Sequence, residues 1–124
     1  DRFEHIGEPD FDGKVEFLKA CSVFSVPSRI GESRGMAVME AMACGVPVVV
    51  PDMGVFPELL SLTNGGLTFK SGDAASLAAA IAQVVDDPAS ADAMGRSAAE
   101  GISRHYSAEQ MAERVLEEYG RLLA

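Results

Sequence analysis

The chain has 124 residues, of which 48% are hydrophobic and 23% are charged, so it is long enough for one domain with a sizeable core. Its formal net charge of −9 argues against a nucleic-acid-binding protein, because such a protein needs a basic surface. The charge is still compatible with an anionic small ligand, since the backbone N–H groups at a helix start bind phosphate without basic side chains.

Four short apolar segments predict β-strands. They are residues 3–7, 23–26, 48–50 and 66–69. The third of these is a run of valines without alternation, which is typical of a strand that is covered on both faces in a parallel sheet.

Six segments have the spacing or the end signals of helices. They are residues 12–21, 36–44, 57–62, 74–85, 89–104 and the segment that starts at Ser107. Asp73 and Ser107 are predicted N-caps, and Gly45 is a predicted C-terminal glycine. The helix over residues 89–104 is the weaker prediction, because Gly95 and Gly101 interrupt it. The last helix has an apolar face formed by Met111, Val115, Tyr119 and Leu122.

This alternation predicts an α/β fold, a Rossmann-like three-layer domain with an open parallel sheet of about four strands. We expect helices on both faces and the C-terminal helices packed on one side. The chain begins at Asp1 and leads directly into a strand-like segment, so we interpret residues 1–124 as a single partial domain of a longer protein.

Other classes of site find little support in the sequence. Cys21 and Cys44 lie in apolar runs, and we expect both to be buried, reduced thiols. No Cys or His spacing is typical of a metal site. No apolar run reaches the roughly 18 residues of a membrane span, and no signal peptide is recognisable, which favours a cytoplasmic protein.

The loop over residues 28–35 is predicted to lie at the carboxyl ends of the strands, where ligands bind in such sheets. Gly35 lets a ligand approach the backbone closely. The first N–H groups of the following helix lack intrahelical partners and carry the positive end of the helix dipole. A phosphate group is therefore a suitable ligand for this helix start.

Two carboxylates flank the helix start. Glu32 lies in the loop, and Glu40 is the only charged side chain in residues 36–44 and tilts back toward the same rim. Together they are compatible with a sugar-nucleotide pocket. Other interpretations stay open. Glu32 could be an exposed acid that interacts favourably with the helix dipole, and Glu40 could be the ion-pair partner of a Lys or Arg.

Residues 27–49 resemble the signature of family 4 retaining glycosyltransferases, which have the GT-B fold, and the similarity extends over nearly the whole fragment. The spacing of Glu32 and Glu40 matches the Glu-x7-Glu motif of that family. Residues 54–58 resemble its Gly-Gly-x-Pro-Glu turn, with Val55 in place of the second glycine. Arg34 stands where the family usually has an aromatic residue.

The resemblance implies the nucleotide-sugar-binding C-terminal half of a two-domain enzyme, which transfers a hexose from a nucleotide-diphosphate sugar with retention of configuration. It implies that Glu32 is the catalytic residue and binds the donor sugar, and that Glu40 binds the ribose hydroxyls. The implied donor-binding residues are Glu32, Ser33, Arg34, Gly35, Met36, Ala37 and Glu40, with Gly54 and Glu58 as secondary candidates.

The resemblance also implies that no cofactor or metal is required. The acceptor is a glycan, a lipid or a small molecule and would bind the N-terminal domain, which lies upstream together with a basic pair and the first strands. Peripheral membrane association of the full-length enzyme is compatible with this. We expect the fragment alone to bind donor weakly and to transfer nothing.

A non-catalytic nucleotide-binding or regulatory module is the alternative, since the same sheet permits it. A dinucleotide dehydrogenase is disfavoured because no Gly-x-Gly-x-x-Gly follows a strand. A receiver-type signalling domain is disfavoured because no acidic cluster stands at the strand ends.

Overall fold

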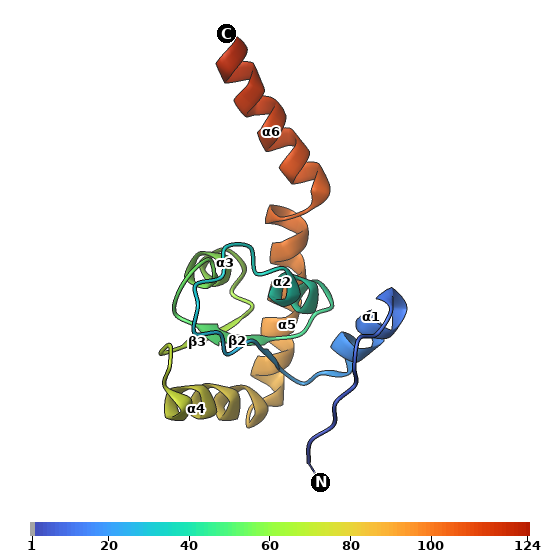
Figure 1. The fold of residues 1–124 in the computed structure, drawn as a ribbon, viewed down its shortest axis with the longest axis vertical. Coiled ribbons are helices and arrows are strands. Elements are labelled where there is room, and N and C mark those ends of the chain that lie inside the picture. The colour runs from blue at the N-terminus through green and yellow to red at the C-terminus, as the bar shows by residue number, and fades with distance from the viewer. Residues whose placement is uncertain (1) are drawn as a thin grey trace.

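The computed structural model describes residues 2–124 and has the predicted α/β architecture with an open parallel sheet (Figure 1). Its elements in chain order are α1 (Phe11–Ala20), β1 (Phe24–Ser25), α2 (Met36–Ala43), β2 (Val48–Pro51), α3 (Phe56–Thr63), β3 (Gly66–Phe69), α4 (Ala74–Val85), α5 (Pro88–His105) and α6 (Ala108–Leu123).

The described part of the sheet has three parallel strands in the order β1-β2-β3, rather than about four. The prediction of a strand over residues 3–7 is wrong: this segment has no regular secondary structure, and Phe3 and Ile6 are exposed. An alternating pattern forms a strand only where a neighbouring strand completes its hydrogen bonds, and no neighbour does so here. β1 is also shorter than predicted, with only Phe24 and Ser25 in the ladder.

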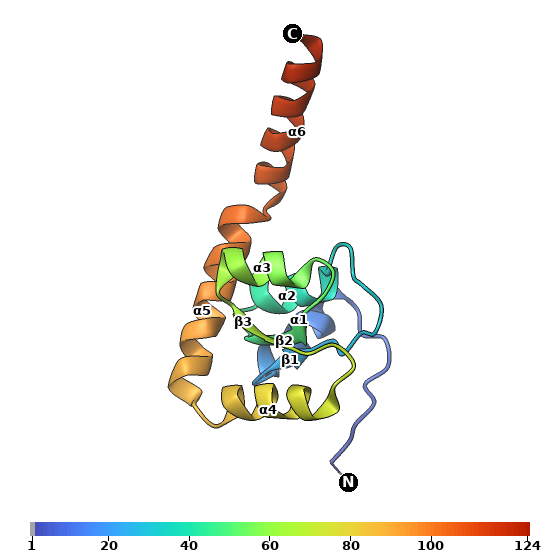
Figure 2. The same ribbon diagram turned by 90° about the vertical axis from the view of Figure 1, so that its left-hand side faces the viewer.

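Helices cover both faces of the sheet, with α2 and α3 on one side and α4 on the other (Figure 2). The valines of β2 are fully buried and alternate between two cores, as expected for a strand that is covered on both faces. Val48 and Val50 join the core that includes Phe56, whereas Val49 joins the core beneath α4. The carboxyl ends of the strands are therefore held from both sides.

Helix α5 runs uninterrupted over 18 residues, so its two glycines do not weaken it as the sequence suggested. A methyl group added to Gly95 would overlap the carbonyl oxygen of Gly45, and one added to Gly101 would lie 2.7 Å from the Thr63 side chain. Both glycines mark places where α5 crosses closely over the segments that lead into β2 and β3. They are packing contacts at the amino edge of the sheet.

Helix α6 begins at the predicted cap, where the Ser107 hydroxyl accepts a hydrogen bond from the Gln110 N–H at 3.2 Å. The expectation that the C-terminal helices pack on one side is wrong for α6, and α5 contacts helices of both faces, α2 and α3 as well as α4. Helix α6 projects away from the other elements (Figure 1), and none of its residues is buried. Its apolar face is exposed because no other described element extends as far as it does.

Candidate functional site

The loop after β1 and the turn after β2 are joined at the carboxyl edge of the sheet. The Val55 N–H donates to the Glu32 carbonyl oxygen at 2.9 Å. Gly54 has a φ of 63°, and a Cβ at this position would lie only 2.5 Å from the same oxygen. Only glycine satisfies both conditions without strain. Gly54 therefore shapes the backbone on which Glu32 stands.

The start of α2 is held against α3 by a second glycine. Gly35 is the N-cap residue, has a φ of 67° and is buried. A Cβ on it would lie 3.1 Å from the Phe56 ring. No side-chain hydrogen bond caps this helix from its N-cap residue, in contrast to α1, α4, α5 and α6. The helix start is thus fixed in position while its N–H groups stay open to another acceptor.

The Glu32 carboxylate lies beside this helix start. Its Oε1 atom is 3.4 Å from the backbone nitrogens of both Arg34 and Gly35. At that length the two hydrogen bonds are weak, and the side chain is exposed. Glu32 is therefore a partner of the helix dipole in this structure, and a ligand oxygen can replace it at little cost.

Glu40 pairs with Lys14 of α1, whose Nζ lies 3.0 Å from its Oε1 atom. Each side chain is 39% exposed, so the pair resembles a surface ion pair, worth about 0–1 kcal/mol. The open question about Glu40 is thus answered in part by a basic partner. No group in residues 2–124 hydrogen-bonds its second oxygen, Oε2, which is left for a ligand.

Lys14 is the site-adjacent residue that sequence reasoning missed, because the basic groups were expected upstream of the chain. A signal was present in the sequence. Lys14 lies four residues before Leu18, and residues at this spacing share one face of a helix. Leu18 is the buried residue of α1. The helix face that bears Leu18 therefore lies toward the core, and Lys14 lies on the same face.

The remaining predicted donor-binding residues are exposed around the helix start. They are Ser33, Arg34, Met36 and Ala37. Glu58 lies in the first turn of α3 and is exposed. Burial, followed by the negative charge of Glu58, raises the pKa of Tyr106, which caps the C-terminal end of α5. Glu58 thus occupies the position of a helix-start acid.

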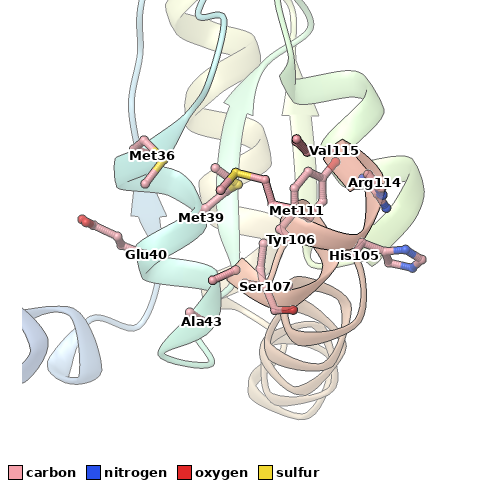
Figure 3. A pocket seen from close by; sticks show the side chains of 12 residues that line it. Met36, Met39, Glu40, Ala43, His105, Tyr106, Ser107, Met111, Arg114 and Val115 are labelled. Carbon is pink, nitrogen blue, oxygen red and sulfur yellow. The ribbon is translucent and has the colours of Figure 1, made fainter. Parts of the chain in front are cut away.

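An apolar groove of about 550 Å³ lies between α2 and the junction of α5 and α6 (Figure 3). Met39 lines it from α2, and Tyr106 and Met111 line it from the junction. Figure 3 shows the Glu40 carboxylate pointing away from Tyr106 and Met111. The groove also borders on Met36 and Glu40, so it adjoins the candidate donor site along α2, although the Glu40 carboxylate itself points away.

Some other predicted site types can be checked within residues 2–124. Cys21 and Cys44 are free, as predicted, but they are half-buried rather than buried, and burial raises the pKa of the Cys21 thiol. No group of three or more His, Cys, Asp or Glu side chains in this range has the arrangement of a metal site. None of the described helices combines the length and the apolar character that crossing a membrane requires.

The family model described as "Glycosyl transferases group 1" matches residues 1–101 of the chain. A GDP-mannose-dependent monoacylated alpha-(1-6)-phosphatidylinositol monomannoside mannosyltransferase of Corynebacterium glutamicum is 29% identical over 89% of the chain and 30% of its own length. An alpha-maltose-1-phosphate synthase of Mycobacterium tuberculosis is 34% identical over 88% of the chain and 30% of its own length.

The solved structure of a sucrose-phosphate synthase from Thermosynechococcus elongatus superposes on the chain with a TM-score of 0.84 and 30% sequence identity. The match covers 95% of the chain and 29% of the synthase. The chain thus spans only about 30% of the length of the relatives that it matches.

Proposed function

Because the chain belongs to the group 1 glycosyl transferases, we propose that it is the donor-binding half of a two-domain enzyme, which transfers a hexose from a nucleotide-diphosphate sugar with retention of configuration. The observation that carries the proposal is the start of α2. It combines open backbone N–H groups, the weakly held carboxylate of Glu32 and the half-exposed carboxylate of Glu40.

The proposed roles follow from these positions. The N–H groups near Gly35, Met36 and Ala37 bind the donor sugar and diphosphate and stabilise the negative charge that grows on the leaving diphosphate. Glu32 exchanges its long contacts with the backbone for hydroxyl groups of the hexose, and so positions the reacting carbon. Glu40 accepts hydrogen bonds from the ribose hydroxyls. No step in this scheme uses a metal ion.

Several surfaces of the chain support the proposal that it is part of a larger enzyme. Among residues 2–124, β1 pairs only with β2, so its other edge is open to a further strand. Large apolar side chains are exposed before it, Phe3 and Phe11 among them. We propose that the upstream part supplies the remaining strands, the basic pair and the acceptor domain, and that the isolated chain transfers nothing.

The donor and the acceptor differ among the relatives by their names, which include a GDP-mannose-dependent mannosyltransferase that acts on a phosphatidylinositol monomannoside and a sucrose-phosphate synthase. We therefore propose a hexose donor without choosing its base. The acceptor is a glycan, a lipid or a small molecule. A lipid acceptor would bring the full-length enzyme to a membrane surface.

The test is to titrate uridine, guanosine and adenosine diphosphate sugars into the full-length protein and to measure donor hydrolysis and transfer. We expect Glu32→Ala to lower kcat/KM by roughly 10²–10³-fold, because it removes a group that acts on the reacting sugar. Glu40→Ala should raise the donor KM by about tenfold or more, since hydrogen bonds to a charged group are lost.

Glu100→Ala is the matched control, because Glu100 is an exposed acid in α5. The site assignment is wrong if neither Glu32→Ala nor Glu40→Ala changes binding or turnover. A full-length protein that binds a nucleotide sugar but neither hydrolyses nor transfers it would support the non-catalytic module instead.

A further inference from the structure

Lys14 of α1 approaches the site from a helix that the donor-binding motif does not include, and it forms the only ion pair of Glu40 within residues 2–124. We propose that Lys14 is a positioning residue, which holds the Glu40 carboxylate in the orientation that accepts the ribose hydroxyls of the donor. This inference rests on the proposed function of Glu40. It adds a residue outside the motif to the donor site.

The sequence of α1 fixes where Lys14 lies. The Asp10 carboxylate caps the helix by accepting a hydrogen bond from the Gly13 N–H at 2.9 Å. Leu18 is 4% exposed and packs in the same core as Val38 of α2. Lys14 is one turn before Leu18 on the same face, so anchoring Leu18 brings the ammonium group to α2. The Lys14 ammonium also lies 5.8 Å from the centre of the Phe11 ring.

The geometry of the pair suits positioning. The ammonium group contacts one carboxylate oxygen, Oε1, and leaves Oε2 without a hydrogen bond in the described part of the chain. A glutamate side chain on a helix surface otherwise samples several rotamers. Fixing one oxygen removes that freedom before the ligand arrives, which lowers the entropy cost of binding. The second oxygen, together with the free lone pairs of the first, then faces the ligand in one orientation.

The position of the pair argues against a purely structural role. Both side chains are 39% exposed, and surface ion pairs of this kind contribute little to folding. Leu18 already anchors α1 to the core. No other side chain of α2 is charged, so Glu40 depends on α1 for a cation. Its one partner is therefore placed where it affects the orientation of the carboxylate more than the stability of the fold.

The experiment uses the full-length protein and needs no acceptor. The affinities of GDP, UDP and ADP are measured by calorimetry, and the tightest of the three is compared with its 2′-deoxy and 3′-deoxy counterparts. The variants are Lys14→Met, Lys14→Arg, Glu40→Gln and the double variant Lys14→Met/Glu40→Gln. Lys19→Met is the matched control, because Lys19 is an exposed lysine of the same helix.

We expect Lys14→Met to lower the affinity for the ribonucleotide by about two- to fivefold, the size of a surface ion-pair effect. The affinity for the deoxy counterpart that lacks the hydroxyl bound by Glu40 should fall less, so the preference for ribose decreases. Lys14→Arg should keep the preference for ribose because it keeps the positive charge, and Lys19→Met should leave this preference unchanged. The double variant should bind as Glu40→Gln does, because Lys14 acts through Glu40.

The positioning role is overturned if Lys14→Met leaves the preference for ribose unchanged, whether the affinities stay constant or all fall by the same factor. Equal weakening would indicate that Lys14 only packs α1 on α2. The proposed function fails separately, if Glu40→Gln itself does not reduce the preference for ribose. A second variant that removes the charge, Lys14→Gln, is tested in the same way as Lys14→Met. The unfolding midpoint of every variant is also measured, so that a folding defect is not mistaken for a loss of binding.

Discussion

The two edges of the sheet are built in opposite ways. Helix α5 closes the amino edge, whereas the loop after β1 lies at the carboxyl edge, on the other side of the molecule (Figure 2). Three strands and their helices connect the two edges. The difference between them shows where the backbones are tightly packed and where polar groups stay exposed.

At the amino edge, backbones lie in direct contact. No room exists for a side chain at Gly95, which faces the Gly45 carbonyl group. A Cβ on Gly65 would lie 2.6 Å from both the Ala98 and the Met42 side chains. Ala98 and Met42 are fully buried. Such packing makes each of these glycines sensitive to the addition of one methyl group.

At the carboxyl edge, the polar groups are weakly engaged. The contacts of Glu32 with the backbone are 3.4 Å long, and the Lys14–Glu40 pair is half-exposed. The backbone around Glu32 is fixed by the close contacts of Gly35 and Gly54 and by the hydrogen bond from the Val55 N–H to the Glu32 carbonyl oxygen. A rigid backbone that carries loosely held polar groups suits a binding site, because a ligand can replace their partners without disturbing the fold.

The largest effect that the comparison predicts is the loss of stability at the amino edge. We expect Gly95→Ala to lower the free energy of unfolding of the 124-residue chain by about 2 kcal/mol. Overpacking at the Gly45 carbonyl group should exceed the roughly 1 kcal/mol that alanine gains over glycine in a helix. Urea denaturation followed by circular dichroism measures the change.

Gly120→Ala is the control for this substitution. It also replaces a glycine inside a helix, but no atom apart from the adjoining residues and the backbone of its own helix lies within 4 Å of the added methyl group. It should therefore keep or increase the stability. If Gly95→Ala proves as stable as the unchanged chain, α5 does not close the amino edge as described.

The sequence predicted the elements that depend on local patterns. The strand over residues 66–69 matches β3 residue for residue, and the valine run is the fully buried β2. The Asp73 and Ser107 caps are present, because an N-cap needs only its own helix start. The motif residues lie together for a similar reason, since the loop and the helix that carry them are neighbours in the chain.

Features that depend on distant parts of the chain were predicted less well. Residues 3–7 have the pattern of a strand but lack a neighbouring strand. The glycines of α5 looked like helix breakers, because their contacts with Gly45 and Thr63 lie far away in the sequence. Lys14 was not identified as the ion-pair partner of Glu40, because 26 residues separate the two. The orientation of α6 was missed because it depends on how the chain turns at Tyr106.

An intermediate effect is predicted for a helix start at the carboxyl edge that does carry its own cap. The Asp73 carboxylate accepts a hydrogen bond from the Ser76 N–H at 3.0 Å. Asp73→Ala should lower the free energy of unfolding by about 1 kcal/mol, because the cap is lost. Asp86→Ala, at the other end of α4, is the control and should cause no loss, since an acid at a helix C-terminus is not favourable. Equal losses in both variants would contradict the assignment of the cap.

The smallest change in stability is predicted for the residue with the largest expected effect on activity. Glu32→Ala should change the free energy of unfolding by no more than about 0.5 kcal/mol, because an exposed acid with 3.4 Å contacts contributes little to a helix start. Urea denaturation of the 124-residue chain tests this, with Glu32→Gln to separate the charge from the hydrogen bonds. A loss near that of Asp73→Ala in both variants would mean that Glu32 is a structural cap of α2. Glu32 would then stabilise the carboxyl edge, as the close-packed glycines stabilise the amino edge.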